Sequence, residues 1–398
     1  ERIEGNDKMS GNGTPMGERV HIAFLGKRNA GKSSLMNAVT NQPMAIVSDT
    51  PGTTTDPVSK AMELLPLGPV LMIDTAGLDD TGELGSQRVH KSMQVMRKTD
   101  LAILVTNGAE PLDVIELALL EQLNSRSIPY VLVRNKCDLT DRRDGEGVFV
   151  SARTGEGIDA LKQAMIQAVP REESPRLVGD LLTPGDLVVL VIPIDEAAPK
   201  GRIILPQQQV LRDVLDAHAS AVVCQAEDLP RTLSTLNTPP RIVITDSQAF
   251  GQVSRDTPES VPLTSFSILM ARAKGNLSAI AAGAMAADHL QDGDRILVSE
   301  GCTHHRQCGD IGTVKLPAWL KKHSGRQLEF DFTSGTDFPE QLEQYAMVVH
   351  CGGCMLNTRE VRYRYALARS QGVPMTNYGI LIAHMKGILA RSIAPFGL

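Results

Sequence analysis

The sequence predicts an α/β fold divided into three domains. With 398 residues, the chain is too long for one typical domain of about 100–200 residues. Short apolar runs alternate with amphipathic segments along almost its whole length, which is typical of parallel sheets covered by helices. Pro170 and the charged stretch behind it mark a linker. We therefore expect domains at 20–172, 178–266 and 267–398, preceded by a flexible, glycine-rich tail over 1–19.

The first domain is expected to build an open sheet. Its apolar runs have the length of strands, and amphipathic stretches of helical length alternate with them. The expected strands are 20–26, 70–75, 101–107, 129–135 and 147–151, and the expected helices are 34–40, 113–123 and 158–169. This order predicts a parallel sheet wound with helices.

The two smaller domains show the same alternation. The middle domain has expected strands at 187–194, 220–225 and 241–246 and one helix at 208–219. It carries no chemical motif, and its strand 187–194 is a candidate edge for pairing with a second copy. The last domain is expected to open near Met270 with one Ala-rich helix over 271–290. Its further strands are 295–300, 328–332, 345–350 and 373–378, with helical patterns at 317–323 and 358–372.

Composition excludes several classes of function. The formal net charge is -6, and the aromatic residues are only eight Phe, five Tyr and one Trp, which disfavours a general nucleic-acid binder. No apolar run approaches the roughly 18 residues of a membrane span. Six cysteines without an export signal favour a reducing compartment. We expect no nucleic-acid partner, no membrane span and a cytoplasmic location.

A phosphate-binding loop follows the first strand. The residues from Gly26 to Ser33 fit the pattern G-x-x-x-x-G-K-[ST], between a predicted strand and a predicted helix. In this pattern backbone N–H groups surround a phosphate, Lys32 reaches the β- and γ-phosphates, and the Ser33 hydroxyl binds Mg²⁺. The expected nucleotide contacts in this segment are Gly26, Asn29, Ala30, Gly31, Lys32, Ser33 and Ser34.

Three further motifs end predicted strands and indicate GTP. Asp74, in the motif DTAG, is placed to hold the metal through water, and Gly77 to donate its N–H to the γ-phosphate. In the motif NKCD, the Asp138 carboxylate can accept two hydrogen bonds from guanine, and adenine lacks that donor pair. Ser151 and Ala152 follow the next strand, where a backbone N–H can reach guanine O6. Asn135 and Lys136 complete the expected base site.

These motifs, in the order GKRNAGKSSL, GTTTD, DTAGL, NKCD and SAR, resemble the GTPase superclass that contains Era, the tRNA-modifying GTPase MnmE and the ribosome-assembly GTPases. The resemblance implies that Thr54 contacts Mg²⁺ when the γ-phosphate is present. Leu78 stands where Ras-like enzymes have a water-orienting Gln. MnmE-like members with Asn in the loop use K⁺, and Asn29 holds the matching position; it is alternatively a turn residue. Glu83 is a weak candidate for positioning water and is alternatively an exposed loop carboxylate.

Cysteines cluster behind two strands of the last domain. The strand 295–300 leads into Cys302 and His304, and the strand 345–350 ends at His350 and is followed by Cys351 and Cys354. If the two strands are parallel neighbours, these loops meet at one sheet edge. Thiolates in such an arrangement suit iron–sulfur clusters or Zn²⁺. A structural zinc site that includes Cys308 is the competing interpretation. His289, His305 and His323 are interpreted as surface or core histidines.

The GTPase motifs followed by C-x-H and then H-C-x-x-C resemble the HydF family of FeFe-hydrogenase maturation GTPases, over about 20–398. The resemblance implies a homodimeric scaffold that uses GTP, Mg²⁺ and K⁺. It implies a 4Fe-4S cluster on Cys302, Cys351 and Cys354, and a di-iron precursor delivered to apo FeFe-hydrogenase. The implied further partners are two radical-SAM maturases. On this reading Lys32, Thr54 and Gly77 serve GTP hydrolysis.

Two questions stay open at the level of sequence. His304 and His350 are either fourth iron ligands or hydrogen-bonding neighbours of the cluster, and Cys308 lies outside the family pattern and is interpreted as a spare thiol. The alternative function is a zinc-stapled GTPase in RNA modification or ribosome assembly.

Overall fold

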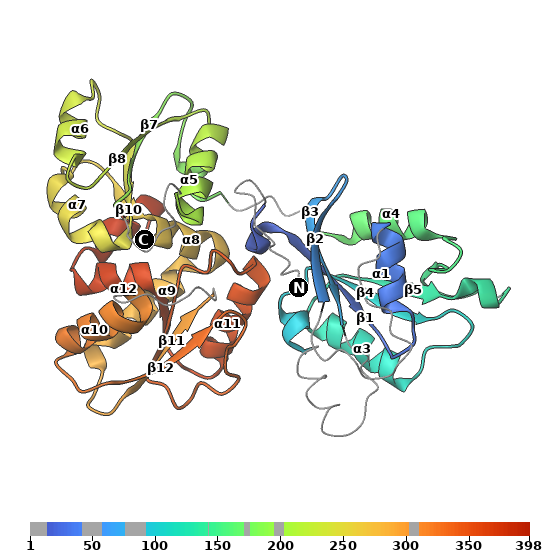
Figure 1. Cartoon of the computed structure of the whole chain (residues 1–398). Helices are drawn as coiled ribbons and strands as arrows, with labels where there is room; N and C mark the ends of the chain where they lie inside the picture. The colour runs from blue at the N-terminus through green and yellow to red at the C-terminus, as the bar shows by residue number, and fades with distance from the viewer. Residues whose placement is uncertain are drawn as a thin grey trace, which may run out of the picture. The chain divides into compact units, whose positions relative to one another are not determined.

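The chain forms two compact units, Glu1–Glu172 and Glu173–Leu398, in a computed structural model (Figure 1). The structure describes residues 14–41, 58–75, 93–141, 143–170, 176–194, 203–301 and 310–398. Of the expected N-terminal tail, 14–19 are described, and Met16–Glu18 form a 3-10 turn. Within the described ranges, no helix is long and apolar enough to cross a bilayer.

The first unit is a six-stranded sheet with helices on both faces. The strand order is β2-β3-β1-β4-β5-β6, and all neighbours are parallel except β2 and β3. The strands are β1 (Val20–Leu25), β2 (Val58–Leu64), β3 (Gly68–Asp74), β4 (Leu101–Asn107), β5 (Tyr130–Asn135) and β6 (Val148–Phe149). The helices are α1 (Lys32–Thr40), α3 (Val114–Ser125) and α4 (Ile158–Ala168), with a 3-10 turn η2 (Cys137–Leu139).

Burial on both faces explains the continuous apolar strands of this sheet. Leu35 of α1 and Leu161 of α4 pack in one buried cluster, and Leu119 and Leu123 of α3 pack in the other. The antiparallel strand β2 has no counterpart among the predicted strands. Its mostly exposed residues lie at the sheet edge and carry a weak apolar signal.

The second unit contains two four-stranded sheets, ordered β10-β9-β7-β8 and β12-β11-β13-β14, with parallel neighbours throughout. The strands are β7 (Leu187–Val191), β8 (Ser220–Cys224), β9 (Ile242–Thr245), β10 (Leu263–Ser265), β11 (Arg295–Glu300), β12 (Glu329–Ser334), β13 (Met347–His350) and β14 (Met375–Asn377). The α-helices are α5 (Leu205–Asp216), α6 (Leu229–Thr235), α7 (Phe250–Asp256), α8 (Phe266–Lys274), α9 (Leu277–Ala284), α10 (Leu316–Ser324), α11 (Thr358–Ser370), α12 (Tyr378–Met385) and α13 (Leu389–Ile393). Short helical turns are η3 (Gly179–Leu181), η4 (Ser247–Ala249), η5 (Met285–His289), η6 (Ile311–Lys315) and η7 (Ala394–Phe396).

One apolar cluster joins these two sheets. Val189 of β7 and Val298 of β11 belong to the same buried group, together with Ile268 of α8 and Ile380 of α12. Helix α8 also packs its other side on the outer face of the middle sheet through Leu269. The two domains expected at 178–266 and 267–398 therefore share a core.

Two local expectations were wrong. The strand at 187–194 is not a sheet edge, because β7 lies between β8 and β9, and the edges are β8 and β10. The Ala-rich segment is not one helix, because α8 ends at Lys274 and α9 begins behind Asn276, whose side chain caps it. The sequence analysis also missed β10, α6, α7, α12 and α13, although five of the eight residues of α12 are buried.

Candidate functional site

The phosphate-binding loop connects β1 to α1, and two glycines permit its path. Gly26 has φ 142° and Gly31 has φ 89°, a backbone region that favours glycine. A Cβ at Gly26 would lie 2.3 Å from the Val105 carbonyl oxygen, and a Cβ at Gly31 would lie 2.3 Å from Asn135 Nδ2. Asn29 also adopts the left-handed conformation, with φ 59°. The loop therefore lies close against β4 and β5, at Val105 and Asn135, and helix α1 begins directly after Gly31.

Two polar side chains of the loop region converge at the start of α1. Ser33 Oγ donates to Asp74 Oδ2 at 2.5 Å, and Asp74 Oδ1 is buried without a hydrogen bond among the described residues. Burial raises the pKa of Asp74, and the hydrogen bond from Ser33 and the nearby Lys32 ammonium oppose the shift. A hydroxyl beside an unsatisfied buried carboxylate fits the oxygen ligands that Mg²⁺ prefers. Lys32 Nζ donates to the carbonyls of Gly26 and Lys27 at 3.1 and 2.7 Å, so it lies across the loop.

Asn135 links the phosphate loop to the expected guanine site. Its side chain is buried and donates from Nδ2 to the Ala30 carbonyl at 2.8 Å, and Oδ1 accepts from the Ala152 N–H at 3.1 Å. Lys136 adopts a left-handed conformation and turns the chain into η2, which leaves Asp138 exposed. Ser151 is fully buried and its Oγ accepts from the Thr154 N–H. The structure therefore brings together the predicted loops around Gly31, Asn135 and Ala152.

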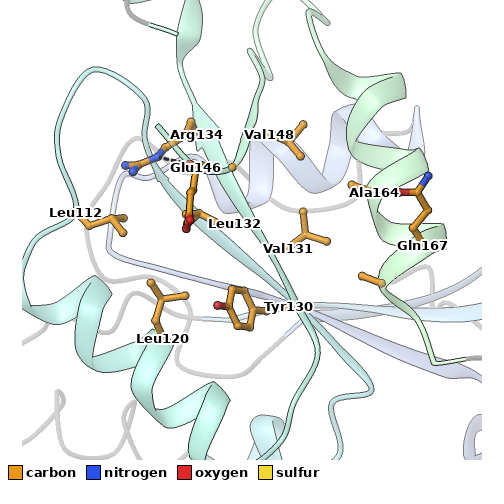
Figure 2. Close-up of a pocket in the computed structure, with 12 residues that line it drawn as sticks. Leu112, Leu120, Tyr130, Val131, Leu132, Arg134, Glu146, Val148, Ala164 and Gln167 are labelled. Carbon is orange, nitrogen blue, oxygen red and sulfur yellow. Dashed lines mark hydrogen bonds between the residues drawn. The ribbon is translucent and has the colours of Figure 1, made fainter. Parts of the chain in front are cut away.

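A separate hollow of about 630 Å³ opens beside β5 and contains none of these motif residues (Figure 2). Leu112, Leu120, Tyr130 and Val148 are among the residues that line it. It lies where β6 pairs with β5 only at Val133 and Arg134. Its lining also holds the polar side chains of Arg134, Glu146 and Gln167, and Arg134 Nε donates to the Glu146 carbonyl.

Several predicted site residues lie outside the described ranges. They are Thr54, Gly77, Leu78, Glu83, Cys302, His304, His305 and Cys308.

The two strands that carry the cysteine motifs are parallel neighbours. Ser299 of β11 is in register with His350 of β13. Beyond this pair, Cys351 Sγ accepts from the Gly301 N–H at 3.0 Å and from the Gly353 N–H at 3.3 Å. The residue before Cys302 therefore touches the Cys351 sulfur, at the carboxyl ends of both strands. Backbone N–H groups aimed at sulfur are a common feature of iron–sulfur sites.

Both described cysteines of this site are half-buried. Burial raises the pKa of Cys351 to about 11, against the opposing effect of the two N–H groups. Burial also raises the pKa of Cys354, while Lys274 opposes that shift. Lys274 Nζ donates to the carbonyls of Gly353 and Leu356 at 2.8 and 2.7 Å, behind the loop. A buried ammonium at this point favours the negative charge of metal-bound thiolates, so the residues present fit an anionic cluster.

His350 is directed into the protein interior. Its Nδ1–H donates to the Cys351 carbonyl at 2.7 Å, and its Nε2 accepts from Arg364 Nη1 at 3.0 Å. Burial and the Arg364 charge lower the pKa of His350 to about 3, so the ring is neutral. In this arrangement neither ring nitrogen has a lone pair available for iron.

Two buried cations of this site were missed in the sequence. Lys274 ends α8, and Arg364 is fully buried on α11, where it also donates to Glu360 Oε1 at 2.8 Å. Arg364 stands three residues after Val361 and four before Ala368, both buried, so its helical position was a usable signal. Lys274 likewise follows the buried Met270 and Ala271 by four and three residues, but its contact with the Gly353 loop could not be read from the sequence.

Family comparison decides the assignment of the chain. Residues 177–275 match a family model described as the hydrogen maturase F dimerization domain, and residues 278–395 match the hydrogen maturase F tetramerization domain. Together they cover more than half of the chain. The chain belongs to the HydF family. Residues 21–136 match a third model, the 50S ribosome-binding GTPase, so this HydF member carries a P-loop GTPase domain in front of its oligomerisation domains. Family membership assigns it to the hydrogenase maturases.

Individual relatives match only part of the chain. The chain is 37% identical over 165 residues to the tRNA modification GTPase MnmE of Laribacter hongkongensis, which is 39% of this chain and 36% of that protein. It is 35% identical over 175 residues to MnmE of Geobacter sulfurreducens, or 42% of this chain and 37% of that protein. The chain thus spans little more than a third of the length of these relatives. Era from Aquifex aeolicus is 18% identical, with a TM-score of 0.35, over 52% of this chain and 93% of Era.

Proposed function

We propose that this HydF chain is a GTP-hydrolysing scaffold that holds a 4Fe-4S cluster and carries a di-iron precursor to apo FeFe-hydrogenase. Two radical-SAM maturases would build the precursor. The observation that carries the proposal is the contact between the Gly301 N–H and Cys351 Sγ, which brings the residue directly before Cys302 to the Cys351 sulfur at one sheet edge. Cys302, Cys351 and Cys354 would be the protein ligands of the cluster.

The nucleotide half of the proposal rests on the loop around Lys32. GTP with Mg²⁺ is the ligand expected of a GTPase domain, and the Ser33 hydroxyl and Asp74 carboxylate lie together as oxygen donors. Lys32 and the loop N–H groups would stabilise charge on the phosphates, and Asp138 would accept hydrogen bonds from guanine. Thr54 and Gly77 would contact the metal and the γ-phosphate. Asn29 would bind a K⁺ ion that adds positive charge there.

The cluster half predicts an exchangeable fourth iron ligand. Three cysteines leave one iron of a 4Fe-4S cluster without a thiolate. Both His350 nitrogens are engaged, so we assign His350 the role of orienting the Cys351 backbone through Arg364. Because the fourth iron of the cluster has no cysteine ligand, an incoming di-iron precursor can bind to it without breaking an iron–cysteine bond.

The dimer expected of this family would form at the middle sheet. Strand β8 is its outer strand beside β7, and Val223 of β8 is 49% exposed. An exposed strand edge is a template for pairing with a second chain. We assign β8 as the pairing edge, in place of the strand at 187–194.

Anaerobic reconstitution with iron and sulfide, followed by EPR of the reduced protein, tests the scaffold proposal. Serine at Cys302, Cys351 or Cys354 should abolish the cluster signal and hydrogenase activation while GTP turnover persists, because the GTPase unit has its own core. Cys224→Ser is the matched control, since Cys224 is a half-buried cysteine outside the motif. Cys308→Ser should also retain the cluster.

Two outcomes would reject the proposal. Stoichiometric zinc with no iron uptake would favour a zinc-stapled GTPase. Loss of the cluster in Cys308→Ser as complete as in Cys351→Ser would replace the open-site arrangement with four cysteine ligands.

A further inference from the structure

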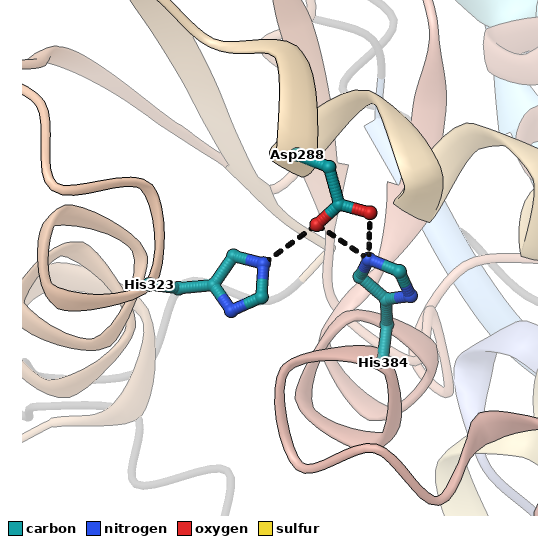
Figure 3. A group of neighbouring side chains, drawn as sticks. All are labelled: Asp288, His323 and His384. Carbon is teal, nitrogen blue, oxygen red and sulfur yellow. Dashed lines mark hydrogen bonds and ion pairs between the residues drawn. The ribbon is translucent and has the colours of Figure 1, made fainter.

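A second cluster of metal-ligating side chains lies on the last domain, formed by Asp288, His323 and His384 (Figure 3). His323 Nε2 lies 2.7 Å from Asp288 Oδ1, and His384 Nε2 lies 3.0 Å from both carboxylate oxygens. One ligand atom from each residue falls within 4.8 Å of the other two. The three side chains therefore point to one common position.

Three different elements build this position. Asp288 comes from η5, His323 from the last turn of α10, and His384 from the last turn of α12. Leu320 of α10 and Ile380 of α12 belong to the same buried cluster, which holds these helices together. The negative ends of both helix dipoles thus lie near the imidazoles, and this end of a helix favours a cation. Preorganisation by packed elements distinguishes the cluster from a chance meeting of flexible surface chains.

We propose that Asp288, His323 and His384 bind a divalent first-row transition-metal ion of the zinc type, at a site separate from the cysteine loop. Two imidazoles and one carboxylate are a ligand set that such ions accept, with a fourth position left to water. Tetrahedral coordination at about 2.0–2.1 Å would set the ligand atoms about 3.3 Å apart. The present contacts of 2.7–3.0 Å need to open by only a few tenths of an ångström.

The proposed site lies away from the cysteine site along α12. Asn377, directly before this helix, is in register with His350 on β14 and β13, and His384 lies seven residues further on. At 1.5 Å per residue that is about 10 Å of helix. The side chains of the cluster are 16–43% exposed, so an ion can enter from solvent. A bound ion would cross-link η5, α10 and α12.

A control residue for the cluster lies next to it in the sequence. His289 is adjacent in sequence, exposed and outside the cluster, which makes it a matched control.

The test uses full-length, tag-free protein carrying Cys351→Ser and Cys354→Ser, with excess Mg·GDP to fill the nucleotide site. Zn²⁺ is titrated calorimetrically into this parent and into versions that add His323→Gln, His384→Gln, Asp288→Asn or His289→Gln. The parent and the His289→Gln version should bind one more equivalent than the others, or bind it at least tenfold more tightly. Asp288→Asn keeps the shape of the side chain and a hydrogen-bonding oxygen. A loss of Zn²⁺ binding in this version therefore shows that the carboxylate is a metal ligand, and not that the fold has changed.

Cobalt(II) provides a second readout in the same parent, which carries Cys351→Ser and Cys354→Ser. An ion at the proposed site should give visible d–d absorption without the sulfur-to-cobalt charge transfer that marks cysteine ligands, and His384→Gln should remove that absorption. Zn²⁺ should also raise the Tm of the parent but not that of His323→Gln. Equal Zn²⁺ stoichiometry and affinity in all versions, or cobalt spectra unchanged by His384→Gln, would overturn the proposal.

Discussion

The buried Arg364–Glu360 pair is expected to stabilise the second unit strongly. Arg364 is fully buried and Glu360 is 3% exposed. The guanidinium also donates to His350, to Ser299 Oγ at 3.3 Å and to the Gly335 carbonyl at 2.7 Å. Arg364→Met preserves much of the packing against Phe338 but leaves the Glu360 carboxylate without its partner. Breaking one side of a buried ion pair costs about 3–5 kcal/mol.

Arg212 provides a matched control for this change. Arg212 and Asp216 form an ion pair with the same four-residue spacing on α5, but their side chains are 76% and 55% exposed. An exposed pair of this kind contributes little to stability, because water and salt screen the two charges. Arg212→Met should therefore leave stability almost unchanged. Adding Glu360→Leu to Arg364→Met should recover part of the loss, because no buried charge is then left unpaired.

Fluorescence of the single tryptophan reports this unit directly, because Trp319 lies on α10 and packs against the core shared by both sheets. With a urea m-value of about 2–3 kcal/mol/M, a loss of about 3–5 kcal/mol shifts the midpoint of unfolding by about 1–2.5 M. A midpoint for Arg364→Met no lower than that of Arg212→Met would refute the reasoning. GTP turnover serves as an internal reference for the first unit.

The remaining predictions concern the nucleotide site and the dimer. GTP turnover by the wild-type chain should be slow, and it should be faster in KCl than in NaCl at equal ionic strength. Asn29→Ala should remove this difference, and equal wild-type rates in the two salts would contradict a K⁺ site. Asp138→Asn should shift preference from GTP towards xanthosine triphosphate, measured by competition, and unchanged preference would argue against its contact with guanine. Lys32→Ala should weaken nucleotide binding, with titration of a fluorescent GDP analogue as the measurement. Val223→Lys should weaken the dimer in light scattering if β8 is the pairing edge, because the ammonium would have to be desolvated there; an unchanged mass would count against β8.

Much of the first unit was predictable because its signals are local. The apolar runs ending at Leu25, Asp74 and Asn135 form buried parallel strands, and the glycines at 26 and 31 stand where the backbone needs them. A strand buried on both faces must be apolar along its length, so its position can be recognised from the amino-acid sequence alone. The exposed edge strand β2 carries no such signal and was missed.

From the sequence, the cysteine site could be predicted only up to the ends of the two strands that carry its motifs. C-x-H and H-C-x-x-C at two apolar runs indicated a shared sheet edge, and the pairing of Ser299 with His350 places Gly301 against Cys351. Which charges lie behind the loop depended on packing. The helical position of Arg364 could indicate that it is buried, but only the folded core places Lys274 and Arg364 against Gly353 and His350.

The sequence alone therefore determined the order of the domains, the phosphate loop and the cysteine motif, because each depends on residues close together in the chain. Tertiary structure alone decided that β7 is interior, that His350 is engaged by Arg364, and that Asp288, His323 and His384 meet. These outcomes follow from packing between elements 14–96 residues apart. Local pattern cannot report them, because sequence separation places no limit on which buried faces come into contact.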